Sequence, residues 1–332
     1  MKKLETNMQK EDALPISGTF LDEISYDIPH QNWGYDEWDK DFQAMKSAGI
    51  DTVIMIRCGL KRWMTYPSKV LSKHQGCYMP SLDLVRLFLS LAEKYSISFY
   101  FGTYDSDHFW THKNHEQEVE LSMRVVEEAW KLYGDSPAFK GWYLCWETGS
   151  LSASPDVASL YSRIGKHCKE LSGGLPVMIS PFIDGCKGVS QYSAEIKNAN
   201  GTVSTAQHEK KWDDIMSTIK GSVDIVAFQD GHTEYSELQE FLAINKNLAD
   251  KYSLRCWTNS ETFDRDMPIK FLPIKWEKLL LKLKAAKAVG FEKAITFEFS
   301  HFMSPNSCYP QAHGLFKRHA EYFGVCSNIN LI

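Results

Sequence analysis

The chain has 332 residues, of which 43% are hydrophobic, 13% aromatic and 24% charged, and its formal net charge is -5. A chain of this kind can bury a large core, and its acidic balance argues against nucleic acid and an anionic membrane as main partners. No apolar run approaches the length of a membrane span, and residues 1–14 are charged and polar rather than signal-like. We therefore expect a protein that is cytoplasmic as the sequence stands, or periplasmic or exported if a leader precedes it.

The eight cysteines form no C-x-x-C pair. Three of them, Cys58, Cys145 and Cys256, fall inside predicted strands, where a small buried thiol is the usual interpretation. This pattern favours a reducing compartment over a disulfide framework.

Short apolar runs and amphipathic helical patterns alternate along the whole chain. The apolar runs mostly lack polar alternation, which is typical of strands covered on both faces. Strands are predicted at residues 16–22, 51–58, 97–104, 142–146, 176–180, 224–229, 254–258 and 293–299. Helices are predicted at residues 35–49, 82–95, 116–133, 154–171, 209–220, 236–252, 275–289 and 309–323.

Eight strands that are each followed by a helix predict a single (β/α)8 TIM barrel over residues 15–325. Residues 1–14 are expected to be an extended or disordered segment, and 326–332 a C-terminal tail. The alternative is a doubly wound open sheet, which normally has a Gly-rich turn after its first strand; residues 19–26 contain none.

The active site of such a barrel lies at the C-terminal ends of its strands. The polar residues predicted at these ends are Glu23, Arg57, Asp105, Asp107, His108, Glu147, Ser180, Gln229, Asp230, His232, Glu261 and Glu298. Carboxylates dominate this set. It offers no Lys for a Schiff base, and no Gly-rich turn follows the seventh or eighth strand to hold a phosphate.

Several side chains that bind metals follow the third strand closely in sequence, namely Asp105, Asp107, His108, His112 and His115. A metal-dependent hydrolase built on Asp105, His108 and Asp230 is therefore an alternative. Zinc barrels usually take ligands from several strands, however, and a His-x-His on the first strand is missing. We expect neither a metal nor a cofactor.

A pair of carboxylates is the chemistry that the strand ends favour. Glycoside hydrolysis needs a protonated acid for the leaving oxygen and an ionised carboxylate as nucleophile or base. Glu147 after the fourth strand and Glu261 after the seventh would face each other across the barrel mouth. Carboxyl groups about 5 Å apart would indicate a retaining mechanism and a wider gap inversion.

Each of these two assignments has an alternative in the sequence. Glu147 could be a structural carboxylate paired with Arg57. Asp264, Asp266 and Glu298 compete with Glu261 as the partner of Glu147.

The positions of Glu147 and Glu261 resemble those in the clan A glycoside hydrolases. That superfamily of (β/α)8 barrels has its acid/base after strand four and its nucleophile after strand seven. It usually has Asn before the first Glu, whereas Trp146 stands here. The segments 18–29 (GTFLDEISYDIP), 49–53 (GIDTV) and 141–143 (GWY), with Trp38, resemble a domain-of-unknown-function family of barrels common in gut Bacteroidetes. This resemblance covers most of the chain and implies a glycosidase-like cleft.

Aromatic and polar residues around the predicted mouth are candidates for substrate binding. The possible sugar platforms are Trp63, Tyr66, Trp110, Trp146 and Trp257, because amphipathic rings serve this purpose as well as packing. The polar candidates are Glu23, Arg57, Asp105, His108, Asp230 and Glu298. A glycan-binding barrel without catalysis remains a further alternative. The sugar, the linkage and the oligomeric state are not predicted.

Overall fold

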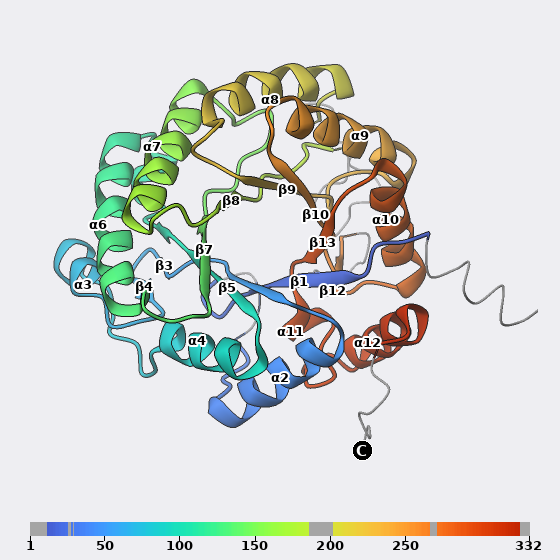
Figure 1. Ribbon diagram of the computed structural model, residues 1–332, viewed down its shortest axis with the longest axis horizontal. Helices are drawn as coiled ribbons and strands as arrows, with labels where there is room; N and C mark the ends of the chain where they lie inside the picture. Colours follow the sequence, from blue (N-terminus) through green and yellow to red (C-terminus); the bar gives the residue numbers. More distant parts are fainter. Residues whose placement is uncertain (1–11, 26–27, 29, 186–201, 266–270, 326–332) are drawn as a thin grey trace, which may run out of the picture.

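The computed structural model describes residues 12–25, 28, 30–185, 202–265 and 271–325. Eight parallel strands form a closed barrel, and helices surround it as a ring (Figure 1). In chain order the barrel strands are β1 (Ile16–Leu21), β2 (Thr52–Met55), β5 (Ser98–Gly102), β7 (Phe139–Leu144), β8 (Val177–Ile179), β9 (Ile225–Gln229), β10 (Arg255–Asn259) and β13 (Lys293–Thr296). The first and last strands pair, with Gly18 beside Ile295, so the sheet closes. The predicted single (β/α)8 barrel is confirmed.

One long helix follows each barrel strand. These helices are α2 (Tyr35–Ser47), α4 (Leu84–Tyr95), α6 (His115–Tyr133), α7 (Pro155–Leu171), α8 (Thr205–Ile219), α9 (Tyr235–Lys251), α10 (Trp276–Val289) and α12 (Pro310–Phe323). Local sequence sets their ends. The Ser154 hydroxyl accepts a hydrogen bond from the Val157 amide at the start of α7, and Gly290 adopts the left-handed conformation that ends α10.

The fourth strand begins and ends earlier than its sequence predicts. It was expected at 142–146 and occupies Phe139–Leu144. Gly141 allows the earlier start, because a Cβ there would lie 2.3 Å from the Tyr100 ring of the neighbouring strand. Cys145 and Trp146 therefore leave the sheet while staying buried. Glu147 follows in the loop at the C-terminal end.

Short elements extend the strand ends at the mouth of the barrel. Strands β3 (Gly59–Leu60), β4 (Trp63–Met64) and β6 (Tyr104–Asp105) form a small sheet, with β3 parallel to β6. Because β3 follows β2 and β6 follows β5, this sheet lies on the C-terminal side. The other additions are the helices α3 (Lys69–Gln75), α5 (His108–Thr111) and α11 (Phe299–Phe302) and the hairpin β11 (Phe263–Asp264) with β12 (Leu272–Pro273). The segment 59–80 between β2 and α4 thus contains two short strands and a helix.

The six cysteines within the described residues are all free thiols, and Cys58, Cys145 and Cys256 are buried as expected. In the part of the chain that the structure describes, no helix is both long and apolar enough to cross a membrane. The predicted tail, 326–332, lies outside the described residues, as does most of the predicted N-terminal segment 1–14.

Candidate active site

Glu147 and Glu261 follow the fourth and seventh barrel strands and lie close enough for their charges to interact. Both emerge at the C-terminal end of the barrel, which is where the strand order predicts them. The chain therefore brings together two carboxylates separated by more than a hundred residues in sequence. Their surroundings differ, and that difference sets the chemistry of each.

Glu147 is held by an amide. The Gln229 side chain, at the end of β9, donates a hydrogen bond of 3.0 Å to Glu147 Oε1 and a second of 2.8 Å to the Ser180 carbonyl oxygen. The second bond fixes the amide and so orients the carboxyl group. Burial raises the pKa of Glu147 to about 7, against the opposing effects of the Arg57 charge and the Gln229 hydrogen bond. At neutral pH a large fraction of Glu147 is therefore protonated.

Glu261 is held by a cation. Arg265 Nε donates to Glu261 Oε2 at 2.8 Å, and Arg265 Nη2 donates to Oε1 at 2.7 Å, a bidentate pair. Burial alone would raise the pKa of this carboxyl, which is 2% exposed, but the Arg265 charge and hydrogen bonds outweigh burial and lower it. Glu261 is therefore ionised at neutral pH.

Asp230 and Gly231, which directly follow β9, contact Glu261 and determine its position. A Cβ on Gly231 would lie 1.7 Å from Glu261 Oε2 and 2.4 Å from Arg265 Nε, so only glycine leaves room for the pair. Asp230 is buried and accepts hydrogen bonds from the Glu261 amide at 3.2 Å and from Lys282 Nζ at 2.7 Å. Asp230 was predicted to bind substrate, and in the structure its Oδ1 supports the backbone of Glu261.

Arg57 contributes charge to the site. Its Nη1 donates to Asp105 Oδ2 at 3.3 Å, and both side chains are largely buried. Asp105 Oδ1 also accepts from the Asp107 amide at 2.7 Å. The Arg57 charge lowers the pKa of Glu147, yet its ion pair is with Asp105. The alternative of a structural Glu147–Arg57 salt bridge is therefore not what the fold forms.

Glu298 was predicted as a substrate contact or as the partner of Glu147, and in the structure its carboxylate has a helix-capping role. It is fully buried, and its carboxylate caps α11 by accepting from the Ser300 and His301 amides at 3.0 and 2.6 Å. A carboxylate used in this way satisfies a helix N-terminus. The competing Asp264 is also buried and pairs with Lys278 at 2.7 Å, while Asp266 lies outside the described residues.

Two of the predicted aromatic platforms, Tyr66 and Trp257, are buried, and the other three lie in different settings. Trp146 is 1% exposed and donates to Glu118 Oε1 at 3.1 Å, so a sugar cannot stack on it and that expectation is corrected. Trp110 is half-buried, with its ring centroid 6.4 Å from that of Trp146. Trp63 is 62% exposed on β4. Of the three, Trp63 offers the most surface to a ligand.

The residues of the metal alternative do not assemble. Asp105 is tied to Arg57, Asp230 to Lys282, and His108 is exposed on α5 beside the ring of His112. Among the residues described here, no group of three or more His, Cys, Asp or Glu side chains is arranged to hold a metal ion.

Three residues that contact the two glutamates were given no role by sequence reasoning. Arg265 stands four residues after Glu261, but a loop position gives no helical spacing from which a pair could be inferred. Gln229 is identified as a strand-end residue without a role, because its contact with Glu147 joins strands far apart in sequence. Gly231, next to Asp230, indicates a turn, and only the structure shows the carboxylate packed against it.

The fold and these strand-end acids define a (β/α)8 barrel with two electrostatically distinct carboxylates at its mouth. Residues 16–309 match the family described as a domain of unknown function, DUF4434, and the chain belongs to this family. The predicted resemblance to such a family is confirmed.

The chain is also similar to proteins of known structure. A candidate alpha-L-fucosidase from Bacteroides thetaiotaomicron VPI-5482 is 54% identical, with a TM-score of 0.89 over 95% of each chain. An endo-beta-1,4-mannanase from Thermotoga petrophila is 11% identical, with a TM-score of 0.56 over 97% of this chain and 79% of the other. The mannanase likeness shows the fold alone. A comparison with curated proteins found no match.

Proposed function

We propose that the protein is a glycoside hydrolase in which Glu147 is the general acid/base and Glu261 the nucleophile. The observation that carries this proposal is the contrast between two neighbouring carboxyl groups, one bound by the neutral Gln229 amide and the other by the Arg265 guanidinium. Glu147 has a pKa of about 7, raised mainly by burial, whereas Arg265 lowers the pKa of Glu261. Glycosidases need such a pair, because one carboxyl group must give a proton while the other stays ionised.

The proposed reaction has two steps. Glu147 donates its proton to the glycosidic oxygen as that oxygen leaves the anomeric carbon, and the Glu261 carboxylate forms a bond to the same carbon. Glu147, now ionised, then takes a proton from a water molecule, and the water oxygen displaces Glu261. Gln229 orients Glu147 for both transfers, and Arg265 stabilises the Glu261 carboxylate that departs in the second step.

The role of Glu261 predicts the stereochemistry. A nucleophile requires carboxyl groups about 5 Å apart in the complex with substrate, and the product then keeps its anomeric configuration. An NMR spectrum of the first product anomer measures this directly. Inversion would make Glu261 a general base that activates water instead.

Nitrophenyl and dinitrophenyl glycosides provide the test, beginning with α-L-fucosides because the relative that is 54% identical is a candidate alpha-L-fucosidase. Glu261→Gln should abolish turnover of both. Glu147→Gln should lower turnover by about 10²–10⁴-fold on a poor leaving group, and much less on dinitrophenolate, which leaves without a proton. Undiminished activity of Glu147→Gln on the poor leaving group would sink the assignment.

Glu298→Gln is the control for the choice of partner. The Glu298 carboxylate accepts hydrogen bonds inside the core, so its variant should keep its turnover per folded molecule. Loss of turnover in a folded Glu298→Gln protein, with activity retained in Glu261→Gln, would transfer the nucleophile role to Glu298.

A glycan-binding barrel without catalysis is the second candidate. The observation that favours it is that both Glu261 oxygens are bound by Arg265 and the side chain is 2% exposed. Binding of a glycan by calorimetry without hydrolysis over days would favour this candidate. Turnover that requires Glu147 and Glu261 would exclude it.

A further inference from the structure

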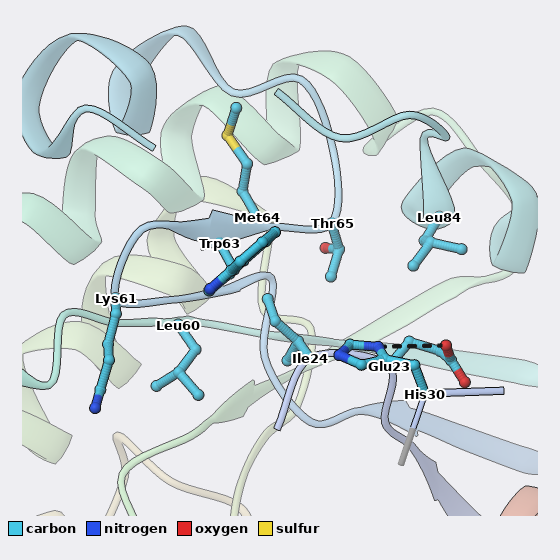
Figure 2. Close-up of a pocket in the computed structure, with 9 residues that line it drawn as sticks. All are labelled: Glu23, Ile24, His30, Leu60, Lys61, Trp63, Met64, Thr65 and Leu84. Carbon is cyan, nitrogen blue, oxygen red and sulfur yellow. Dashed lines mark ion pairs between the residues drawn. The ribbon is translucent and has the colours of Figure 1, made fainter. Parts of the chain in front are cut away.

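A separate cavity of about 310 Å³ lies on the β1–β2 side of the barrel mouth. Its walls come from the turn after β1, the β3–β4 hairpin and the start of α4 (Figure 2). They are mostly apolar, with Ile24, Leu60, Met64 and Leu84 among them. Ligand pockets span about 300–1,000 Å³, so this volume suits a small group such as one sugar ring.

Trp63 gives this cavity an exposed aromatic wall. Trp63 is 62% exposed. The backbone of the β3–β4 hairpin that carries it is closely packed, since a Cβ on Gly59 of β3 would lie 2.9 Å from the Trp63 carbonyl oxygen on β4. Trp63 packs on Tyr78, with ring centroids 5.1 Å apart, and Tyr78 is 47% exposed. Neighbouring exposed rings on an ordered element are typical of binding surfaces, since amphipathic rings contact a ligand with little loss of side-chain freedom.

Glu23 provides a polar anchor at the other end of the cavity. Its side chain is 9% exposed, and Oε2 lies 3.9 Å from Nδ1 of His30, an exposed residue. Within the residues that the structure describes, Glu23 Oε1 is buried without a hydrogen-bond partner. A buried carboxyl oxygen in this state costs free energy unless a ligand hydroxyl or water completes its bonding.

Besides Glu23 and the exposed His30 imidazole, the other polar side chains of the cavity already have partners. The Thr65 hydroxyl donates to the Cys58 carbonyl oxygen at 2.9 Å, and the Lys61 ammonium pairs with Asp107 at 3.2 Å. The cavity thus presents a flat indole ring, aliphatic walls, one carboxyl group and the imidazole of His30. A pyranose ring matches this set, because it has an apolar C–H face for the tryptophan and hydroxyl groups for the carboxyl.

We propose that this cavity is a second saccharide subsite, which binds one ring of a glycan while a neighbouring ring of the same glycan is cleaved between Glu147 and Glu261. The inference rests on the proposed function for the cleaved ring. The cavity lies near Glu147, because Glu23 on its wall directly follows Asp22, and Asp22 is close enough for its charge to act on Glu147. Trp63 stacks on the bound ring, and Glu23 bonds to one of its hydroxyl groups.

Binding measurements on the Glu147→Gln protein test this subsite without relying on turnover. The probes are fucosyllactose and mannotriose, each compared by calorimetry with the nitrophenyl glycoside of its terminal sugar. Trp63→Ala should weaken oligosaccharide binding about tenfold through lost apolar contact, and Glu23→Gln by up to about tenfold through an altered hydrogen bond. The nitrophenyl monoglycosides, which fill the cleavage position alone, should bind all these proteins equally.

Leu281→Ala is the matched control, because Leu281 is an exposed apolar residue on α10 that does not line the cavity. Its affinities should equal those of the parent, and Trp63→Phe should recover part of the oligosaccharide binding. Equal loss for monoglycosides and oligosaccharides, or unchanged oligosaccharide binding in Trp63→Ala, overturns the subsite, as does failure of both oligosaccharides to bind the parent. Binding that depends on Trp63 in a protein that hydrolyses nothing would retain the subsite and reject the proposed function alone.

Discussion

Glu147 and Glu261, at the two ends of the candidate site, are both largely buried acids, but different groups bind their carboxyl oxygens. Each of them lies at a strand end, and burial by itself raises the pKa of both. At the Glu147 end the hydrogen-bond partner is the neutral amide of Gln229, and Glu147 stays protonated to about pH 7. At the Glu261 end the partner is the Arg265 guanidinium, and the pKa falls below its ordinary value.

Burial is the largest cause acting on both pKa values, so the difference between them follows from the directly bound Arg265 cation at Glu261. A hydrogen bond from a neutral donor stabilises a carboxylate by about 1.5–3 kcal/mol, and at Glu147 this bond and the Arg57 charge together do not outweigh the cost of desolvation. A bidentate guanidinium in a buried setting contributes more, because two charge-assisted hydrogen bonds and an ion pair act together. Exchanging or removing the partners should therefore move the two glutamates in predictable directions.

The largest effect is expected from Arg265→Met, which removes the cation at the Glu261 end. Glu261 would be left buried with a much weaker counter-charge, so its pKa should rise and turnover should fall about a hundredfold. The free energy of unfolding should fall by about 3–5 kcal/mol, the range for breaking a buried pair from one side. Urea unfolding at pH 7 and turnover of an aryl glycoside measure the two effects.

Arg163→Met is the matched control for this variant. Arg163 also makes a bidentate pair, with Glu116 at 2.6 and 2.8 Å, but on the surface of the protein. Solvent screens an exposed pair, so its loss should leave both stability and turnover close to the parent values. If the two arginine variants behaved alike, burial would not be what makes the Arg265 pair important.

A smaller effect on the free energy of unfolding is expected for Glu147→Gln and Glu261→Gln, and its sign should differ between the two. Glu147 has its pKa raised from 4.5 to about 7 in the folded protein. The folded state therefore binds its proton more tightly than the unfolded state, and the stability associated with that proton is lost as pH rises from 4.5 to 7. At pH 8 Glu147→Gln removes a destabilising charge and should add about 1–2 kcal/mol to the free energy of unfolding.

The charge of Glu261 has the opposite effect on stability from that of Glu147. Its pKa is lowered in the folded protein, so its charge contributes stability above its ordinary pKa that is lost as pH falls through the folded value. Glu261→Gln should lower the melting temperature at pH 8, while Glu147→Gln raises it by a few degrees. Differential scanning calorimetry of both variants at pH 8 and pH 5 checks the pair of signs. Destabilisation by both substitutions at pH 8 would contradict the assigned charge of Glu147.

The fold was predictable from the sequence because its signals are local and repeated. The sequence contains eight strand patterns, each followed by a helix pattern. An error in the predicted end of one strand leaves the number and order of the strands unchanged. The strand of Gly141 shows this: its start moved to Phe139, and the barrel order was unaffected. Glu147 and Glu261 were predictable for the same reason, since strand order alone places them at the mouth.

The surroundings of the site were less predictable, because they depend on contacts between distant segments. Nothing local distinguishes Glu298, which caps a four-residue helix, from Glu261, which lies at the mouth. Trp146 and Trp63 are both tryptophans near strand ends, yet one is buried against Glu118 and the other is exposed on a hairpin. Side-chain direction at a strand end is set by the loops packed over it, and a sequence pattern does not contain that information.

The smallest expected effect is a shift of a pH profile, and it examines the Glu147 end by itself. If Glu147 must be protonated and Glu261 ionised, kcat/KM should be bell-shaped, with an acid limb below pH 4.5 and an alkaline limb near pH 7. The Gln229 amide donates to Glu147 Oε1 and so lowers its pKa. Gln229→Leu should raise that pKa and move the alkaline limb to higher pH, while the acid limb stays in place.

The position of the limb, rather than the rate, is the informative quantity in this experiment. Gln229→Leu also leaves the Ser180 carbonyl oxygen without its 2.8 Å donor, which costs some stability and activity at every pH. Gln207→Leu removes a solvent-exposed amide from the first turn of α8 and should leave both limbs unchanged. An alkaline limb that stays fixed in Gln229→Leu would mean that a group other than Glu147 titrates there, and the comparison between the two ends would lose its basis. A limb that moves only in Gln229→Leu would tie the proton of the reaction to Glu147.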